Sequence, residues 1–401
     1  MLNRPYRLRE LFFRHVGQTS PSPLGLEIQR AEGVFIYTPE PESKKYIDLV
    51  SGVSVSNVGH SNREVIDAVK EQAERHMHLM VYGEIIQAPQ VELAQLLASQ
   101  LPDPLDVIYF VNSGSEANEA AIKLAKRHTG RREIISCHNC YHGSTHGVLS
   151  LMGDEYYKNA FRPLLPDINH ISFNSLDDLE KISEKTAAVI IEPVQGEGGV
   201  IVPVPGYLAA LREKCNKTGA ILIFDEIQTG FGRCGKLFAC RKYEVTPDII
   251  TLAKALGGGM PLGAFAASAV LMSDWQANPV LGHITTFGGH PVSCAAAQAS
   301  LKILLRENWI EDAERKSNIY KRALESHSLV KEVRTAGLLI AVDLGKREYA
   351  EKILPLLLEE GVMSDWFLFS PSSFRIAPPL SITDEEIEWS LVRIKRALDR
   401  I

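Results

Sequence analysis

ILIFDEIQTG occupies residues 221–230, and DIITLAK follows at residues 248–254. Each stretch contains a short, mostly apolar run that leads to a polar residue, which is Asp225 in the first and Lys254 in the second. Short, continuously apolar runs are typical of parallel strands that are buried on both faces. Since the carboxyl ends of such strands lie along the sheet edge where ligands bind, we expect Asp225 and Lys254 to lie close together.

The same pattern continues on the N-terminal side of this stretch. Short apolar runs alternate with helical stretches, as they do in βαβ units that build a parallel sheet. The predicted strands are Val107 to Val111, Glu133 to Ile135, Ile168 to Phe173, Ala188 to Ile191, Ile221 to Phe224 and Asp248 to Leu252. The predicted fold class is therefore α/β, with a parallel sheet in a large domain.

Several helix boundaries can be predicted from local signals. A Ser or Thr followed three residues later by Glu can form a capping box at a helix start, and Gly is a common helix end. These signals occur at Ser61 and Glu64, at Ser113 and Glu116 with Gly130 as the end, and at Thr383 and Glu386.

After about residue 300 the pattern changes. It predicts a long helix, a strand-like run from Gly337 to Leu344, a helix through Leu358, an extended run from Phe374 to Ile376 and a last helix, which together indicate a smaller α/β domain. We therefore predict three parts: residues 1–50 as an N-terminal segment that packs with the small domain, residues 51–300 as the large domain, and residues 301–401 as the small domain.

Composition excludes several classes of function. The chain has 401 residues and a formal net charge of −6, so it offers no basic field for a nucleic acid. The first residues lack an apolar run after their positive charges, and nowhere do eighteen apolar residues follow one another, so we expect neither export nor membrane insertion. Six cysteines are too few for a disulfide framework in a chain this long, which favours reduced thiols and a cytoplasmic location.

One short stretch raises the alternative of a metal site. Cys137 and Cys140 have the spacing of a zinc-binding pair, and His138 and His142 lie beside them. However, no second pair occurs at the spacing of a zinc knuckle. We therefore expect no metal.

The pairing of Asp225 with Lys254 carries the strongest chemical signal. An amine can form a Schiff base with an aldehyde, and a carboxylate can keep a pyridine nitrogen protonated so that the ring accepts electrons. The alternative is an exposed ion pair without function, which is weak here because both residues close predicted buried strands.

Other stretches could bind the rest of such a cofactor. Residues 112–116, NSGSE, lie where a strand ends and a helix begins, so that free amides and the helix dipole favour a phosphate, although an ordinary helix cap is an equal alternative. Gly257, Gly258 and Gly259 follow Lys254 and allow the backbone to approach a ligand closely. Tyr141 offers a planar ring that could cover a cofactor ring, but a loop aromatic is the commoner explanation.

Nearly the whole chain resembles the class III aminotransferases of the pyridoxal-phosphate fold type I superfamily, which includes the ornithine, acetylornithine, 4-aminobutyrate and diaminopelargonate enzymes. The segments that carry this resemblance are Gly52, NVGH at 57–60, NSGSEANE at 112–119, YHG at 141–143, EPVQGEGG at 192–199, DEIQTGFGR at 225–233, DIITLAK at 248–254, TTFGG at 285–289 and RIAPP at 375–379.

The resemblance implies a mostly parallel seven-stranded sheet, pyridoxal 5'-phosphate as the cofactor, and a homodimer with shared active sites. The resemblance implies that Lys254 forms an imine with the cofactor, that Asp225 pairs with the pyridinium nitrogen, and that Gln228 approaches the phenolic oxygen. It implies that Gly114 and Ser115 bind the phosphate and that Tyr141 stacks on the ring with His142 beside it. It also implies that Glu192 lies near the cofactor and that Thr286 reaches the phosphate of the neighbouring subunit.

By the same likeness, Glu197 lies near the substrate and pairs with Arg375. We expect Arg375 to grip the carboxylate of an amino acid or oxo acid, and Glu197 to take its place when the bound amine has no carboxylate. Exchanging one carboxylate for another avoids the cost of an unpaired buried charge.

The chain departs from the family pattern at two positions. Members whose ω-amino substrates bear a carboxylate often have Arg where this chain has Ser144, and the usual Asn after the Gly-Gly of the Thr286 segment is His290. A hydroxyl cannot replace the planar clamp of a guanidinium, so the amino donor stays open. The predicted activity is transfer of an amino group from an amine or amino acid to pyruvate or 2-oxoglutarate. An aminomutase, a decarboxylase and a non-catalytic cofactor-binding protein are the alternatives.

Overall fold

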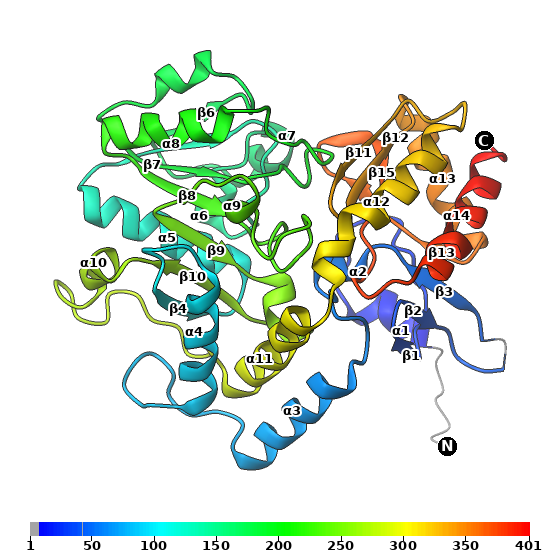
Figure 1. The fold of residues 1–401 in the computed structure, drawn as a ribbon, viewed down its shortest axis with the longest axis horizontal. Helices are drawn as coiled ribbons and strands as arrows, with labels where there is room; N and C mark the ends of the chain where they lie inside the picture. The colour runs from blue at the N-terminus through cyan, green and yellow to red at the C-terminus, as the bar shows by residue number, and fades with distance from the viewer. Residues whose placement is uncertain (1–7, 42) are drawn as a thin grey trace.

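The computed structural model describes residues 8–41 and 43–401. Figure 1 shows a large α/β part built around one sheet and a smaller part that contains the C-terminal elements and the N-terminal strands. Helix α11 (Pro291–Arg306) runs along the large part, and α12 (Trp309–Glu325) lies in the small part. In the described part of the chain, no helix is long and apolar enough to cross a membrane.

The large part contains a seven-stranded sheet in the order β4-β10-β9-β8-β7-β5-β6. Its strands are β4 (Val107–Val111), β5 (Glu133–Cys137), β6 (Ile168–Ile171), β7 (Thr186–Ile191), β8 (Ile221–Asp225), β9 (Ile249–Leu252) and β10 (Gly263–Ala267). All six predicted strands are present, and the mostly parallel seven-stranded sheet is confirmed. Only β10, which was not among the six, runs antiparallel to both of its neighbours.

Alternating side chains of the strands contact two separate hydrophobic clusters. Along β8, Ile221 and Ile223 lie in one cluster with the apolar side of helix α5 (Gly114–Thr129). Leu222 and Phe224 lie in the other cluster with helix α8 (Tyr207–Thr218). The sheet is therefore covered on both faces, which explains why its strands are continuously apolar.

The predicted helix boundaries at Thr383 and Gly130 are confirmed, and the predicted capping box at Ser113 is confirmed in part. At α14 (Asp384–Leu398) the capping box between Thr383 and Glu386 is complete, and Gly130 ends α5 in the left-handed conformation. At α5 the Ser113 hydroxyl accepts from the Glu116 amide at 3.2 Å, as a capping box requires. However, the Glu116 carboxylate accepts from the amide of Asn112 at 2.7 Å, so this box is only half formed.

The predicted cap at Ser61 was wrong. Helix α3 (Arg63–Arg75) is capped by Asn62, whose side-chain oxygen accepts from the Glu64 amide at 3.1 Å. Ser61 has a φ of 53° and donates its hydroxyl to the carbonyl of Ala31 instead. Asn is as good a cap as Ser, so the two neighbouring residues competed for the same role.

The small part contains a second sheet in the order β11-β12-β15-β14. Its strands are β11 (Glu332–Ala336), β12 (Leu339–Asp343), β14 (Trp366–Phe367) and β15 (Ser370–Ile376), and helices α12, α13 (Arg347–Glu359) and α14 accompany it. The single long helix predicted after residue 300 is in fact two, because the chain leaves the helical conformation at Glu307 between α11 and α12.

A third sheet joins the two ends of the chain. Its order is β1-β2-β3-β13, with β1 (Arg30–Glu32), β2 (Phe35–Tyr37), β3 (Lys45–Asp48) and β13 (Val362–Met363). Strand β3 pairs in parallel with β13, so that Ile47 lies opposite Val362. Helix α1 (Leu8–His15) precedes these strands and has no buried side chain.

The remaining helices are mostly short connections. They are α2 (Ser51–Ser54), α4 (Ala88–Gln100), α6 (His146–Leu149), α7 (Glu155–Lys158), α9 (Ala239–Lys242) and α10 (Ala269–Met272), together with the 3-10 turns η1 (Asn159–Phe161), η2 (Asp177–Lys181), η3 (Lys254–Gly257) and η4 (Ser273–Trp275).

Candidate active site

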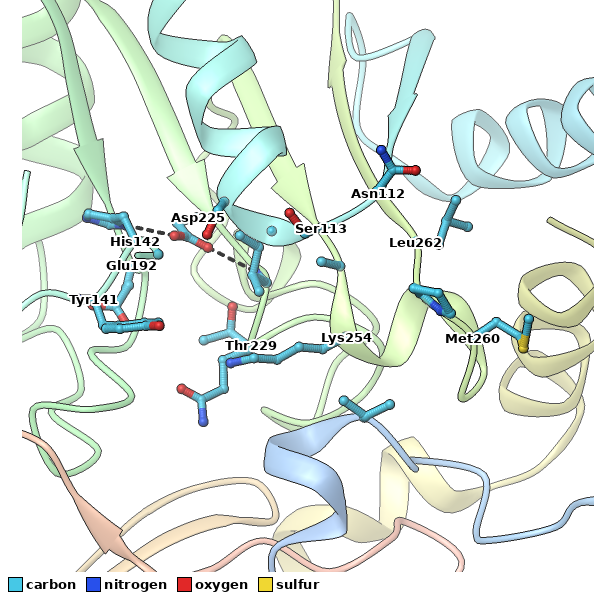
Figure 2. A pocket seen from close by; sticks show the side chains of 18 of the residues that line it. Asn112, Ser113, Tyr141, His142, Glu192, Asp225, Thr229, Lys254, Met260 and Leu262 are labelled. Atoms are coloured by element: carbon cyan, nitrogen blue, oxygen red, sulfur yellow. Dashed lines mark hydrogen bonds and ion pairs between the residues drawn. The ribbon is translucent and has the colours of Figure 1, made fainter. Parts of the chain in front are cut away.

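A cavity of about 510 Å³ lies where β4, β7, β8 and β9 end. Figure 2 shows side chains from these strand ends and from the loop after β5 surrounding it. Among the predicted site residues, its lining contains Gly114, Ser115, Tyr141, His142, Glu192, Asp225, Gln228 and Lys254. The fold thus brings these eight residues, which span 141 positions of the sequence, to one edge of the sheet.

Lys254 follows β9 directly and begins η3 with a φ of 51°. A left-handed conformation is uncommon for a residue with a side chain and is typical of positions that the surrounding fold constrains. Burial lowers the pKa of the Lys254 amine below its ordinary value, although the nearby Glu197 carboxylate opposes this shift. The neutral form of the amine, which can act as a nucleophile or base, is therefore more populated here than in a lysine exposed to water.

Asp225 ends β8 and is nearly inaccessible to solvent, with 4% of its surface exposed. Its Oδ2 lies 2.7 Å from Nδ1 of His142, and its Oδ1 accepts from the amide of Ile227 at 3.0 Å. Burial alone would lower the pKa of His142, but Cys140 and Asp225 beside the ring raise it well above its ordinary value. Figure 2 marks this contact between His142 and Asp225 with a dashed line.

The start of α5 forms one end of the cavity. Gly114 and Ser115 are its first two residues, so their amides lack helical acceptors and the positive end of the helix dipole lies here. A Cβ on Gly114 would come within 2.7 Å of Ile227, and one on Gly143 would collide with Ser115. Both glycines are therefore required by close approach, and the site has the features of an anion-binding pocket.

Gln228 follows Asp225 by three residues and also faces the cavity. Its Nε2 is buried and has no hydrogen-bond partner in the described part of the chain. A Cβ on Gly196 would collide with the side-chain oxygen of Gln228, so a larger residue there would displace this amide. An unpartnered buried donor beside a cavity is the arrangement expected when a ligand oxygen completes the site.

Glu192 supports the loop that carries Tyr141. Its carboxylate accepts from the amides of Tyr141 at 3.3 Å and Gly196 at 3.1 Å. Burial raises the pKa of Glu192 to about 7, with His142 opposing the shift. The Tyr141 hydroxyl lies 3.1 Å from the Ser144 hydroxyl, which stands where the family often has Arg.

Glu197 and Arg375 form a buried ion pair of 2.7 Å, but neither lines the cavity of Lys254. Arg375 also lies 2.9 Å from Asp365, places its guanidinium 4.4 Å from the centre of the Phe367 ring, and donates to the carbonyl of Trp366. Its Nη1 is buried without a hydrogen-bond partner among the described residues. The carboxylate of Asp365 thus also holds Arg375, and no sequence pattern indicated this residue.

The structure does not bring Thr286 to this cavity. Thr286 is exposed in a single chain, in the segment between β10 and α11. The departure at His290 has a local consequence, because its ring stacks on His78 with centroids 5.5 Å apart. His78 also contacts Phe287, so His290 links the segment before α4 to the segment of Thr286.

The thiols of the expected reduced state are all buried. Cys137 and Cys140 belong to the hydrophobic core, and burial raises the pKa of Cys137 well above its ordinary value. In the described ranges, no three His, Cys, Asp or Glu side chains are grouped so as to hold a metal ion.

Three polar residues near the site were missed in the sequence, and two of them, Asn118 and Thr251, are buried. Asn118 donates to Asp225, Thr251 donates to Asn118, and Asp365 contacts Arg375. Asn118 interrupts the apolar side of α5 and Thr251 interrupts β9, so a polar residue on a predicted core face was the available signal. Asp365 has no such signal, because it lies in an irregular stretch before β14.

Known proteins match this chain over nearly its full length. Residues 16–398 match the family model Aminotransferase class-III. The acetylornithine aminotransferase of Methanopyrus kandleri is 41% identical over 363 residues, which are 90% of this chain and 91% of that protein.

Solved structures agree with the fold. An ornithine aminotransferase of Toxoplasma gondii, with partial occupancy of PLP at its active site, has a TM-score of 0.90 at 31% identity and covers 98% of this chain and 94% of its own. An (S)-enantioselective omega-transaminase of Thermomicrobium roseum has a TM-score of 0.91 at 32% identity, with 99% of both chains covered.

Proposed function

We propose, from the premise that the chain belongs to the class III aminotransferases, that Lys254, Asp225 and Arg375 perform its amino transfer. The protein is a pyridoxal-phosphate-dependent transaminase that moves an amino group to a 2-oxo acid. When bound, pyridoxal phosphate supplies an aldehyde and an electron-accepting ring. We assign residues of the cavity as the groups that hold the cofactor and move protons around it.

The cavity suits this cofactor at each of its ends. The start of α5 at Gly114 and Ser115 can receive the phosphate, and Asp225 can receive the protonated ring nitrogen. The unpartnered Nε2 of Gln228 is a donor available to a ring oxygen. We assign Tyr141, which Glu192 supports, to cover the ring, with His142 beside it.

Lys254 is assigned two tasks. Its amine, with a pKa lowered by burial, can attach the cofactor's aldehyde and then, once displaced by the donor, carry a proton between substrate and cofactor. Asp225 would pair with the protonated ring nitrogen. The proton carrier and the charge partner thus belong to the ends of two neighbouring strands, with Lys254 just after β9 and Asp225 at the end of β8.

The observation that carries the substrate proposal is the 2.7 Å ion pair between Glu197 and Arg375. We propose that the carboxylate of an oxo acid displaces Glu197 from Arg375, and that Glu197 returns when a donor without that carboxylate is bound. Asp365, Trp366 and Phe367 all contact Arg375 without Glu197, so the guanidinium stays in place while its carboxylate partner changes.

Glu197→Gln is expected to separate the two half-reactions. With an amine donor bound, Arg375 would lose one of its ionised partners, so the amine half-reaction should slow by roughly 10- to 100-fold, the cost of a hydrogen bond to a charged group. The oxo acid half-reaction should change by less than about threefold, because the substrate's own carboxylate pairs with Arg375. Both are measured as single-turnover changes in cofactor absorbance.

The matched control for this variant is Glu213→Gln, which removes a carboxylate from an exposed ion pair with Lys217. It should alter neither half-reaction. Equal slowing of both half-reactions by Glu197→Gln would contradict the exchange and would leave Glu197 with a purely structural role.

Ser144 directs the donor proposal. Among the residues that the structure describes, no arginine lines the cavity, and the Ser144 hydroxyl contacts Tyr141 instead of offering a guanidinium. We propose a donor amine that has no carboxylate at this end, in contrast to acetylornithine, which the related protein of Methanopyrus kandleri is named for.

Ser144→Arg is expected to shift the preference among donors. A guanidinium can bind a carboxylate in bidentate fashion, so the KM of ω-amino acids and acetylornithine should fall by roughly tenfold relative to that of carboxylate-free amines. Steady-state assays of a donor panel with pyruvate and 2-oxoglutarate measure this change. Ser144→Lys is the control, since it adds charge without the planar fork. An unchanged ranking of donors in Ser144→Arg would mean that this position does not contact the donor.

Homodimerisation with shared sites is proposed from surfaces that a single chain leaves open. Thr286 is exposed, and near it lie exposed apolar side chains, including Phe287 at 54% and, across the His78 contact, Met77 at 65%. A second copy could cover them and bring its Thr286 to the phosphate end. One chain has a mass of 44.4 kDa, so the holoenzyme should sediment with about twice that mass.

The division of the chain and its location complete the proposal. Pairing of β3 with β13 supports residues 1–50 as a segment that packs with residues 301–401, while residues 51–300 form the part that binds the cofactor. We also propose a cytoplasmic location with reduced thiols, supported by six buried free cysteines.

A further inference from the structure

A chain of buried side chains lies behind Asp225. The Thr251 hydroxyl donates to Oδ1 of Asn118 at 2.7 Å, and Nδ2 of Asn118 donates to Oδ2 of Asp225 at 2.8 Å. The same Nδ2 donates to the carbonyl of His142 at 2.8 Å. Asn118 and Thr251 are both fully buried. Because the polar groups that link these side chains are paired, the side chains are held in one arrangement.

The orientation of the Asn118 amide follows from its surroundings. Two acceptors, the Asp225 carboxylate and the His142 carbonyl, lie on one side, so that side must hold the two N–H donors. The amide oxygen then faces Thr251, whose hydroxyl hydrogen can serve it. Thr251 is therefore what prevents the amide from rotating and presenting its oxygen to the carboxylate of Asp225.

The hydrogen bonds to Asp225 leave one position open. A carboxylate has about four lone-pair sites. Oδ2 receives two donors, from Asn118 and His142, and Oδ1 receives one, from the Ile227 amide. One site remains, on Oδ1. The three donors hold this buried carboxylate in one orientation.

The backbone holds this chain in place. Asp225 and Thr251 lie directly opposite each other on the parallel strands β8 and β9, and the amide of Glu226 donates to the carbonyl of Thr251 at 3.0 Å. Helix α5 contacts β9 and brings Asn118 over both strands. The same helix begins at Gly114, so one rigid element connects the phosphate end of the cavity with the carboxylate end.

We propose that Asn118 and Thr251 are positioning residues that fix the orientation of the Asp225 carboxylate and leave one lone pair of Oδ1 for the ring nitrogen of the cofactor. The proposal rests on the role assigned to Asp225 above. Neither residue contacts the reacting atoms, and Thr251 acts through Asn118. Their effect is on the protonation of the ring nitrogen, and therefore on how strongly the ring accepts electrons.

The test uses holoenzyme loaded with pyridoxal phosphate labelled with 15N in the ring. The variants are Thr251→Val, which keeps the shape and removes the hydroxyl, Thr251→Ser, which keeps the hydroxyl, and Asn118→Leu, with Asp225→Asn as the reference. Two quantities are measured: the 15N shift of the ring nitrogen as a function of pH, and the dissociation constant of the cofactor.

In Thr251→Val the ring nitrogen should lose its proton at a lower pH than in the parent, and the cofactor should bind roughly three- to tenfold more weakly. Asn118→Leu should show the same change more strongly, with roughly 10- to 100-fold weaker binding, since it removes a donor to a charged group. Thr251→Ser should restore the parent titration, which a loss of packing alone would not do.

The possible failures are distinguishable. If Asp225→Asn shifts the titration of the ring nitrogen and Thr251→Val does not, Asp225 has its assigned role and the positioning proposal is wrong. If Asp225→Asn itself leaves the titration unchanged, the role of Asp225 is wrong and this proposal falls with it. A failure of Thr251→Ser to restore the parent titration would also overturn the proposal. If Asn118→Leu does not fold, the paired Thr251 variants decide the question.

Discussion

Replacement of Lys254 by Ala is expected to reduce amino transfer by about 10⁴-fold or more. A positioned proton carrier contributes up to about 10⁴-fold to a rate, and the variant also loses covalent attachment of the cofactor. The loss should appear in both half-reactions, because the same amine serves each. Single-turnover measurements with donor and with oxo acid, together with the visible absorption of the loaded protein, test this expectation.

Two further variants show which property of Lys254 matters. Lys254→Arg keeps a positive charge that stays protonated, so it should be as inactive as Lys254→Ala. A small primary amine added to the Lys254→Ala protein should restore part of the rate by carrying protons in solution. Lys236→Ala, at an exposed lysine in the same part of the chain, is the control and should be unaffected. Activity of Lys254→Ala within tenfold of the parent would exclude Lys254 as the proton carrier.

Asp225→Asn is expected to lower the rates of both half-reactions by about 10²- to 10³-fold, the range seen when one preorganised electrostatic partner is removed. The neutral amide cannot compensate a protonated ring, and its N–H group would face the donors of Asn118 and His142. Covalent attachment at Lys254 should persist, because that residue is unchanged. The effect should thus be large on rates and small on the absorbance that reports attachment.

Asp225→Glu and Asp154→Asn are the comparisons for this variant. Glutamate keeps the charge but moves it by one methylene, so it should retain more activity than asparagine. Asp154 caps the short helix α7 away from the cavity, and its substitution should leave both rates unchanged. If Asp225→Asn retained the parent rates while losing stability, Asp225 would be a structural residue only.

The sheet could be predicted because its strands obey a simple physical rule. Ile221 to Phe224 are apolar throughout and Asp248 to Leu252 are mostly apolar, and both runs lie in strands buried on both faces, with only Asp248 outside. The rule also placed Asp225 and Lys254 at one edge, since polar residues that end such strands share that edge. Both residues line the same cavity.

Features that depend on competing local signals were harder to predict. Strand β10 was overlooked because Gly263, Ala264, Ala266 and Ala267 have little β-propensity, and its strand conformation comes from pairing with β4 and β9. The break between α11 and α12 has no Pro or Gly to mark it. Such positions are decided by tertiary packing, which the local sequence does not encode.

In the site, the missed residues are those whose partners lie far away in the sequence. Asn118 meets Asp225 across 107 positions and Thr251 across 133. A sequence pattern identifies side chains at strand ends. The side chains that contact them from behind depend on how α5 packs on the sheet. Asp365 reaches Arg375 only because β14 and β15 are paired.

Helix α1 has a consequence for how this protein behaves on dilution. It has eight residues, none of which is buried by the part of the chain that the structure describes, and an isolated helix of that length is marginal in water. If a second copy covers Leu8–His15, the helical order of this segment follows the law of mass action. Concentrated and dilute solutions of one preparation should then differ in their helical content.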